Sequence, residues 1–390
     1  MAVTSLQDPA PAPPDGAGTA PATVHVHGIE LPDEDVVVPR WRPLGALLKA
    51  IYLVAGLGLF VVALGLMRQG AADLIPALEG SVFTDSAWST LGLGWLGACI
   101  VLSGSPVAAS ALTLLDGGAI DVTQAFTMLT GSRLGAAFVV LVVGAIYALR
   151  DTGGTGRRAP ISIGVLSLLM TTITYVPAAV AGYLLLDAGA FDGLGIGTSP
   201  RLTSLTDALF GGPVDLAVDH LPGWGLFPLG LATLLVGFWL FDKVLPSVGD
   251  AELEHRPQPW YEGKWTMFLL GCGVCLLTLS VSVALTVLVP LVAAGRIRRA
   301  NTLPYIAGAN ITTLADTLVA AVLLGNQDAV RVVVAVTACV TVWTLFLLTF
   351  CYPAVRRLCL GVAGRALASP SRLLAFVMLL FGVPLLLVAV

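Results

Sequence analysis

Residues 102–105 read Leu-Ser-Gly-Ser, and residues 279–282 read Leu-Ser-Val-Ser. The two tetrapeptides lie 177 positions apart, and each interrupts a long apolar stretch, residues 88–115 and residues 265–294. Other residues match at the same offset without a gap: Trp88 and Trp265, Gly94 and Gly271, Gly118 and Gly295, Gly131 and Gly308, Thr172 and Thr349, Tyr175 and Tyr352. Because Ser-x-Ser, Trp, Tyr and Gly rarely coincide by chance, the sequence predicts an internal repeat.

The composition is that of a membrane protein. The chain has 390 residues, of which 57% are hydrophobic and 11% charged, whereas soluble domains carry about 25% charged residues. Several of its apolar segments reach the roughly 20 residues that a helix needs to cross a bilayer. The segments are 44–67, 88–115, 122–149, 161–186, 222–245, 265–294, 302–324, 330–351 and 373–390. We therefore expect an all-α integral membrane protein.

Residues 88–115 and 265–294 either cross the membrane once or fold back as re-entrant hairpins, which is allowed where protein or a water-filled cavity covers the irregular backbone. If both fold back and the N-terminus is cytoplasmic, nearly all 20 Lys and Arg residues lie on the cytoplasmic side. The exceptions are Arg68, Arg201 and Arg331 outside and Arg133 within a span. If both cross, Arg150, Arg157 and Arg158 lie outside. Because basic residues concentrate in cytoplasmic loops, their distribution favours the hairpins.

With two hairpins, the halves of the chain have opposite orientations. Inverted-topology repeats with broken helices are typical of secondary transporters, whose sites lie near the bilayer midplane. We expect a disordered cytoplasmic tail over residues 1–40, repeat 1 over 44–187, an extracytoplasmic loop over 188–221, repeat 2 over 222–365, and an extra C-terminal helix over 372–390. That last helix has no counterpart in the repeat, so it serves either packing or formation of a homodimer.

The first break of each repeat is a candidate anion site. It comprises Ser103, Gly104, Ser105 and Pro106 in one half and Ser280, Val281 and Ser282 in the other. Hydroxyls and freed backbone N–H groups at a hairpin tip can hold an anion at the positive end of a helix. The alternative is that each Ser packs against a neighbouring helix or bonds its own backbone. Because the Ser-x-Ser motif occurs symmetrically in both halves, an anion-binding site is favoured over a packing role.

The second break is predicted at residues 130–135, Thr-Gly-Ser-Arg-Leu-Gly, and at the matching residues 307–313, Ala-Gly-Ala-Asn-Ile-Thr-Thr. Asn310, Thr312 and Thr313 supply oxygen atoms in the middle of a span, and hard cations such as sodium prefer oxygen ligands. Together with Asp316 they form the predicted cation site. Residues 171, 172 and 175, which are Thr, Thr and Tyr, either line the same cavity or pack helices, and packing is favoured.

Arg133 and Asp316 are charged residues within spans. An ionised side chain at mid-bilayer costs about 2.5–3.5 kcal/mol on insertion scales, so each needs a partner. Arg133 pairs either with an anionic substrate, since guanidinium suits phosphate, or with Asp316 across the repeat interface. A structural ion pair without a transport role is the remaining interpretation.

The stretches 280–295 and 303–311 resemble the type II sodium/phosphate cotransporter family, which has a QSSS motif in each repeat followed by VPLVAAG-like and GANIGTT-like segments. The resemblance covers roughly residues 44–352. It implies sodium-coupled symport of inorganic phosphate by an inverted-repeat protein. Family site positions are matched by Ser103, Ser105, Ser280, Ser282, Asn310 and Thr313. The family glutamine is replaced by Leu102 and Leu279, and Arg133 stands where the family has Asn.

We therefore expect a multi-pass plasma-membrane transporter and not an enzyme, since no catalytic constellation is visible. Its expected partners are inorganic phosphate or a similar small anion, sodium and the lipid bilayer, with no nucleic acid and no organic cofactor. Two alternatives stay open. One is an anion transporter that is not coupled to sodium, and the other is a non-transporting scaffold or sensor that keeps the fold.

Overall fold

The computed structural model describes residues 43–78, 81, 84–150, 158–192, 200–244, 263–293 and 297–390. The chain divides into two units, Met1–Ala46 and Leu47–Val390, and the second contains nearly all of the helical structure. The tail expected over residues 1–40 lies outside the described residues. In the described part of the chain all regular structure is helical, as the sequence predicts.

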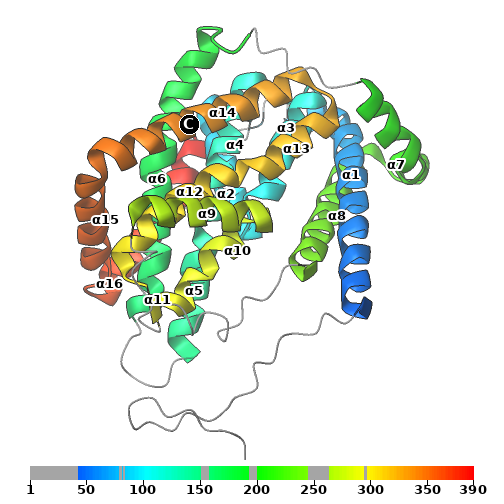
Figure 1. Ribbon diagram of the computed structural model, residues 1–390. Coiled ribbons are helices and arrows are strands. Elements are labelled where there is room, and N and C mark those ends of the chain that lie inside the picture. The colour runs from blue at the N-terminus through cyan, green and yellow to red at the C-terminus, as the bar shows by residue number, and fades with distance from the viewer. Residues whose placement is uncertain are drawn as a thin grey trace, which may run out of the picture. The chain divides into compact units, whose positions relative to one another are not determined.

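The helices follow one another in a simple order (Figure 1). Their bounds are α1 Pro43–Leu78, α2 Ala87–Val101, α3 Ser105–Asp116, α4 Val122–Ala136, α5 Phe138–Arg150, α6 Arg158–Asp187, α7 Pro200–His220, α8 Gly223–Val244, α9 Lys264–Thr278, α10 Val281–Thr286, α11 Leu288–Ala293, the 3₁₀ turn η2 Arg299–Asn301, α12 Thr302–Thr312, α13 Leu314–Leu324, α14 Gln327–Phe346, the π-helical turn η3 Leu347–Cys351, α15 Tyr352–Ala366 and α16 Pro370–Val388.

Seven helical segments of the described chain are long and apolar enough to cross a membrane: 48–76, 122–149, 159–187, 223–241, 299–324, 327–366 and 370–388. They coincide with the apolar segments other than the two expected hairpins. The expected hairpins correspond to the shorter apolar helices Ala87–Val101, Lys264–Thr278 and Val281–Ala293, together with α3. The composition of the helices therefore agrees with a multi-pass membrane protein.

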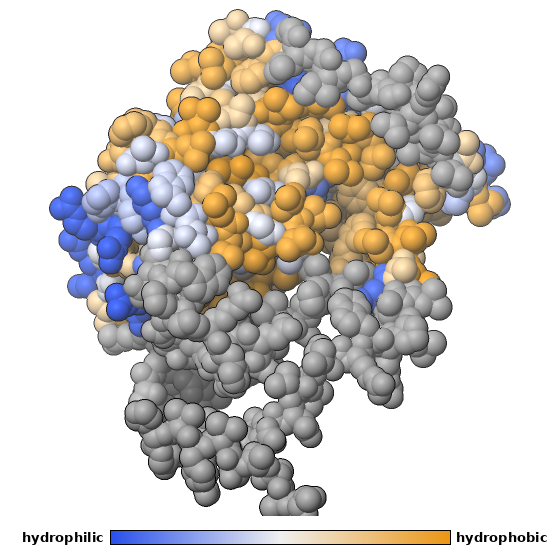
Figure 2. All heavy atoms as spheres, in the orientation of Figure 1, coloured by the Kyte–Doolittle hydropathy of each residue, from blue (hydrophilic) through white to orange (hydrophobic). Residues whose placement is uncertain are grey.

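The surface agrees with a lipid environment. Figure 2 shows hydrophobic residues spread over most of the visible face, with hydrophilic residues gathered over α15. Large apolar side chains are exposed on α1, α6, α8 and α16, among them Val54, Leu184, Trp239 and Leu386. Soluble monomers rarely expose contiguous apolar patches larger than a few hundred Å². Arg356, Arg357 and Arg365 are exposed on the hydrophilic helix α15.

Close helix packing recurs at the 177-residue offset. A Cβ atom added at Gly94 would lie 2.1 Å from the carbonyl oxygen of Met128, and one at Gly271 would lie 2.0 Å from that of Tyr305. Two further matching contacts join Gly131 to the carbonyl of Leu91 (2.1 Å) and Gly308 to the carbonyl of Phe268 (2.2 Å). Glycine thus lets α2 approach α4, and α9 approach α12, at backbone distance.

These glycines explain one difference from the sequence prediction. We expected helix breaks at residues 130–135 and 307–313. In the second half the interruption falls at Thr313, within the predicted range, whereas in the first half α4 runs through residues 130–135 and the interruption comes at Ala137. Gly131 and Gly308 serve helix contact and do not end a helix. A second difference is α7, which lies within residues 188–221, where we expected only a loop.

Candidate functional site

The first break of each half has the same backbone geometry. Leu102 follows α2 with φ 57°, and Leu279 follows α9 with φ 49°. They are the two non-glycine residues with positive φ in the described chain, and their positions differ by the repeat offset. Each lies one residue before the first Ser of its Ser-x-Ser motif. Because left-handed backbone costs an L-residue about 1–2 kcal/mol, each of the two positions carries the same local strain at the point where its helix ends.

The segments 102–105 and 279–282, called the tips below, contact each other. The hydroxyl of Ser282 lies 3.5 Å from the carbonyl oxygen of Leu102, which accepts its hydrogen bond. Ser280 caps α10 by accepting a hydrogen bond from the N–H of Val283 at 3.3 Å. Gly104 is buried against α4, where a Cβ would lie 2.8 Å from the carbonyl oxygen of Ser132. The structure therefore brings the two predicted serine motifs to one place.

A cavity of about 110 Å³ lies between the tips, well above the roughly 10–15 Å³ that one water needs. Its polar lining comes from Ser103, Ser105, Thr278, Ser280 and Asp316. Its apolar lining comes from Leu57, Phe60, Phe238, Phe241, Leu279 and Val319. The site therefore combines hydroxyls from both tips, one carboxylate, and aromatic residues of α1 and α8.

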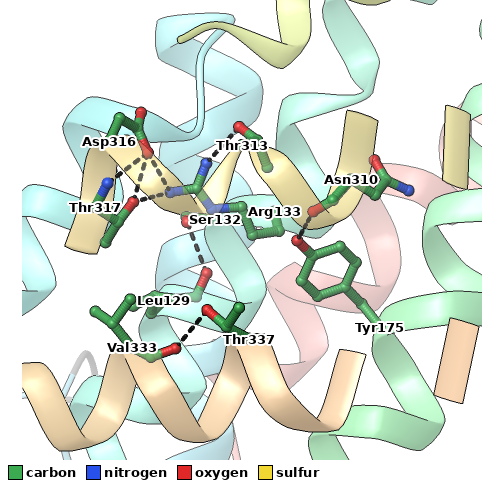
Figure 3. A network of polar contacts seen from close by, with 10 residues as sticks. All are labelled: Leu129, Ser132, Arg133, Tyr175, Asn310, Thr313, Asp316, Thr317, Val333 and Thr337. Carbon is green, nitrogen blue, oxygen red and sulfur yellow. Dashed lines mark hydrogen bonds and ion pairs between the residues drawn. The ribbon is translucent and has the colours of Figure 1, made fainter. Parts of the chain in front are cut away.

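Arg133 and Asp316 meet inside the protein (Figure 3). The Arg133 Nη2 atom lies 3.7 Å from Asp316 Oδ1, and both side chains are buried, with exposed fractions of 1% and 5%. Arg133 also donates hydrogen bonds to the hydroxyls of Thr313, at 3.1 Å, and Thr317. Asp316 Oδ1 in turn accepts hydrogen bonds from the N–H and the hydroxyl of Thr317. Of the two arrangements considered for Arg133, the structure contains the pair with Asp316.

The pair is incompletely satisfied. Asp316 Oδ2 and Arg133 Nε are both buried and have no hydrogen-bond partner. Figure 3 shows the unpartnered carboxylate oxygen of Asp316 pointing away from the guanidinium group. Asp316 lines the cavity and Arg133 does not.

Asn310 belongs to a separate polar cluster with α6. Its amide Nδ2 donates to the hydroxyl of Thr171 at 3.0 Å, with a longer contact of 3.5 Å to Thr174. Its main-chain carbonyl accepts a hydrogen bond from the Tyr175 hydroxyl at 2.6 Å. These contacts join α12 to α6, so Thr171 and Tyr175 take part in helix packing. Asn310 is not among the residues that line the cavity.

The remaining predicted residues bond within their own helices. The Thr312 hydroxyl donates to the carbonyl of Gly308, and the Thr172 hydroxyl donates to that of Leu168. Sequence reasoning missed Thr278, Thr317 and the aromatic residues of α1 and α8. Thr278 and Thr317 were detectable as hydroxyl residues next to Leu279 and Asp316. Nothing in the sequence marks the aromatic residues as neighbours of the tips.

No group of three or more His, Cys, Asp or Glu side chains that could hold a metal ion occurs in the described residues. The comparisons give no relative: no family model, no curated protein and no solved structure matches the chain. The function therefore has to be argued from the geometry of the cavity and its charged lining.

Proposed function

We propose that this chain is a secondary active transporter of the plasma membrane, a sodium-coupled symporter of inorganic phosphate or a similar small anion. Its N-terminus is cytoplasmic, and its substrates bind where the two fold-back tips meet. The observation that carries the proposal is the cavity of about 110 Å³ between Ser103 and Ser280, next to a buried carboxylate at Asp316. Buried ionisable groups inside membrane spans are costly and usually mark a transport pathway.

The contacts at the ends of α2 and α3 support a re-entrant first hairpin. The side-chain amide of Gln124, at the start of α4, donates to the carbonyl of Thr84, just before α2, at 2.6 Å. Since α4 begins a few residues after α3 ends, the chain enters through α2 and returns through α3 to the same side. Asp116 at the end of α3 pairs with Arg68 of α1 at 2.7 Å. A single crossing would separate these groups by the thickness of the membrane.

The direction of two matching helices supports inversion of the repeat. Helix α5 matches α13 at the repeat offset. The span Val122–Leu149 begins on the side of Gln124 and Asp116, so α5 runs away from that side. Helix α13 runs toward it, because Asn326, which follows α13, donates to Asp116 Oδ1 at 2.8 Å. Matching helices that run in opposite directions are what inverted repeats require.

The exchange of contacts between the halves supports the same arrangement. Helix α3 packs on α13 of the other half, and its counterpart α10 packs on α5. Likewise α4 packs on α14, and α12 packs on α6. Such reciprocal pairing is expected of a two-fold relation that has both tips at its interface. Transporters with inverted repeats bind substrate and coupling ion at that interface.

The sequence resemblance is the basis for proposing phosphate and sodium as substrates. The Arg133–Asp316 pair is the basis for the competing interpretation, a non-transporting scaffold. Phosphate and sodium follow from the resemblance of residues 280–311 to the sodium/phosphate cotransporters. A paired Arg133 is also what a non-transporting scaffold would need to close its core. The cavity favours transport, because a scaffold has no use for a hydroxyl-lined space between the tips.

Purified protein reconstituted into liposomes tests the proposal. Radiolabelled phosphate should accumulate when an inward sodium gradient is imposed, and accumulation should collapse when a sodium ionophore dissipates the gradient. Variant Asp328→Asn, altered at an exposed carboxylate away from the cavity, serves as the matched control and should transport normally. Phosphate uptake that does not depend on sodium would favour the uncoupled anion transporter. If no anion is taken up under either gradient, the scaffold interpretation replaces this one.

A further inference from the structure

We infer that helix α15 and the first turn of α16 form a docking surface for the headgroups of anionic phospholipids. The surface consists of Arg357, Arg365 and Arg372, with Gly361 and Gly364 between the first two. None of these residues lines the cavity between the tips. The inference goes beyond the proposed function and does not depend on it.

The charge of this part of the chain is entirely positive. Residues 329–390 contain five arginines and no Asp or Glu. Four of the arginines are exposed and form no salt bridge with an acidic side chain that the structure describes: Arg356, Arg357, Arg365 and Arg372. Figure 2 shows hydrophilic residues gathered over α15. The surface therefore complements a partner that carries negative charge.

The position of α16 places this surface at the level of the lipid headgroups. Helix α16 is long and apolar enough to cross a membrane, and Arg372 lies in its first turn. A charged residue at the end of a span lies at the polar boundary of the bilayer. Arg365 lies in the last turn of α15, just before α16. Both arginines are therefore near the headgroups, which under the proposed orientation belong to the cytoplasmic leaflet.

Two of the arginines share the outer face of α15. The buried residues of the helix form a single stripe: Val355, Cys359, Ala363 and Ala366. Helical residues three or four positions apart lie on the same face. Arg357, Gly361 and Arg365 follow that spacing, and Gly364 lies beside them on the exposed face opposite the buried stripe. One side of α15 thus presents two guanidinium groups with small residues between them.

The glycines leave the backbone between these arginines uncovered. A Cβ atom added at Gly361 or Gly364 would meet nothing within 4 Å, so neither glycine serves close helix packing in the described chain. Arg357 and Arg365 are about 12 Å apart along the helix axis at the usual rise per residue. Both side chains can therefore lean toward a phosphate group placed over the glycines, and guanidinium suits phosphate in charge and geometry.

The exposed apolar residues of α16 distinguish a lipid from a soluble anion. Leu374, Met378 and Leu379 are largely exposed, and they follow Arg372 along α16, which packs on α15. The acyl chains of a lipid whose headgroup lies at the arginines can run along these side chains. Free phosphate would make no use of them, so the surface suits a phospholipid.

A second copy of this chain is the other partner that the glycines suggest, because small residues let two helices approach closely. In a symmetric contact at Gly361, the arginines of one copy would lie against the same arginines of the other. Residues 329–390 offer no acidic side chain to separate them, so these like charges would repel. The charge therefore favours an anionic lipid over a second copy.

Native mass spectrometry of the purified full-length protein in a neutral detergent tests the inference. Dioleoylphosphatidylglycerol is the anionic probe and dioleoylphosphatidylcholine its zwitterionic counterpart, and the wild type should bind the former more tightly. Arg357→Gln with Arg365→Gln should weaken phosphatidylglycerol binding by about thirtyfold, the usual effect of two basic residues near an anionic surface. Phosphatidylcholine binding should not change. Lys243→Gln, which removes an exposed charge at the end of α8, is the matched control and should bind both lipids as the wild type does.

A second variant tests where the headgroup lies. Gly361→Leu with Gly364→Leu keeps both charges but fills the space between them, so it should also weaken phosphatidylglycerol binding without lowering the melting temperature. Equal binding of the two lipids by the wild type, or unchanged binding in either double variant, would overturn the inference. Displacement of the lipid by free inorganic phosphate would overturn it in favour of a general anion site. A dimer that the glycine variant dissociates would overturn it in favour of a second copy. No outcome depends on transport, so failure here leaves the proposed function intact.

Discussion

The hydroxyl of Ser282 and the carbonyl oxygen of Leu102 lie 3.5 Å apart, although the two residues are separated by 180 positions in the chain. This contact joins a residue of the second tip to the turn of the first. Leu102 is the residue at which α2 ends, and Ser282 lies in the first turn of α10, so the contact joins the end of one helix to the start of the other. The meeting of the two tips is therefore a property of the backbone turns at Leu102 and Leu279.

The first prediction concerns those turns. Glycine at Leu102 or Leu279 should leave the free energy of unfolding unchanged or raise it. Relief of left-handed strain gains about 1–2 kcal/mol, while the greater freedom of glycine in the unfolded chain costs about 0.4–1 kcal/mol. The measurement is the apparent melting temperature of Leu102→Gly and Leu279→Gly in detergent.

Leu269→Gly is the matched control, because Leu269 is exposed in the interior of α9. It should lose about 1 kcal/mol, the usual penalty for glycine inside a helix. The interpretation of strained turns is wrong if the tip variants lose as much as the control.

The second prediction concerns the close approach of α9 to α12. Gly271→Ala would place a Cβ 2.0 Å from the carbonyl oxygen of Tyr305, a backbone atom that cannot move alone. Overpacking of this kind costs about 1–3 kcal/mol or more, so expression and melting temperature should fall sharply. Gly273→Ala on the same helix meets nothing within 4 Å and should be neutral or stabilising by up to about 1 kcal/mol. Equal behaviour of the two variants would contradict the close packing of these helices.

Much of the architecture could be predicted because its determinants are local. Long uncharged stretches favour helices of membrane length, and they account for the seven long apolar helices among the described residues. Pairs such as Trp88 and Trp265 predicted a repeat offset, and the breaks at Leu102 and Leu279 lie where the tetrapeptides indicated. The Arg133–Asp316 pair was one of two expected arrangements, because a buried charge needs a partner.

The apolar lining of the cavity and the role of Gly131 depend on tertiary contacts, which cannot be inferred from a single sequence. Phe60 and Phe238 pack edge to face, with ring centroids 5.7 Å apart, and both line the cavity. Their helices are separated by most of the first half and look like any other apolar segment. Gly131 signalled a break because glycine disfavours helices, yet here it permits contact with α2. Propensity alone cannot distinguish these two uses of glycine.

The third prediction concerns the buried ion pair. Arg133→Met should lower the free energy of unfolding by about 3–5 kcal/mol, since it leaves Asp316 charged, buried and unpaired. Asp316→Leu should lower the free energy of unfolding by a similar amount, because it leaves Arg133 charged, buried and unpaired. The double variant should recover most of the loss, because apolar residues can replace a buried pair at little cost. A double-mutant cycle in mixed micelles measures the coupling, and simple additivity of the two losses would show that the residues do not act as a pair.

The fourth prediction concerns the opposite orientation of the repeats. Ala188 follows α6, and Arg365 lies in the last turn of α15; they match at the repeat offset, and both are exposed. In an inverted repeat, matching positions lie on opposite sides of the membrane, and under the proposed orientation the basic residues of α15, Arg365 among them, face the cytoplasm. A membrane-impermeant maleimide should therefore label Ala188→Cys in intact cells, but label Arg365→Cys only after permeabilisation. The wild-type chain, whose six cysteines are buried or partly buried, gives the background. Labelling of both variants in intact cells, or of neither, would place the two positions on one side, which two parallel repeats explain and two inverted repeats do not.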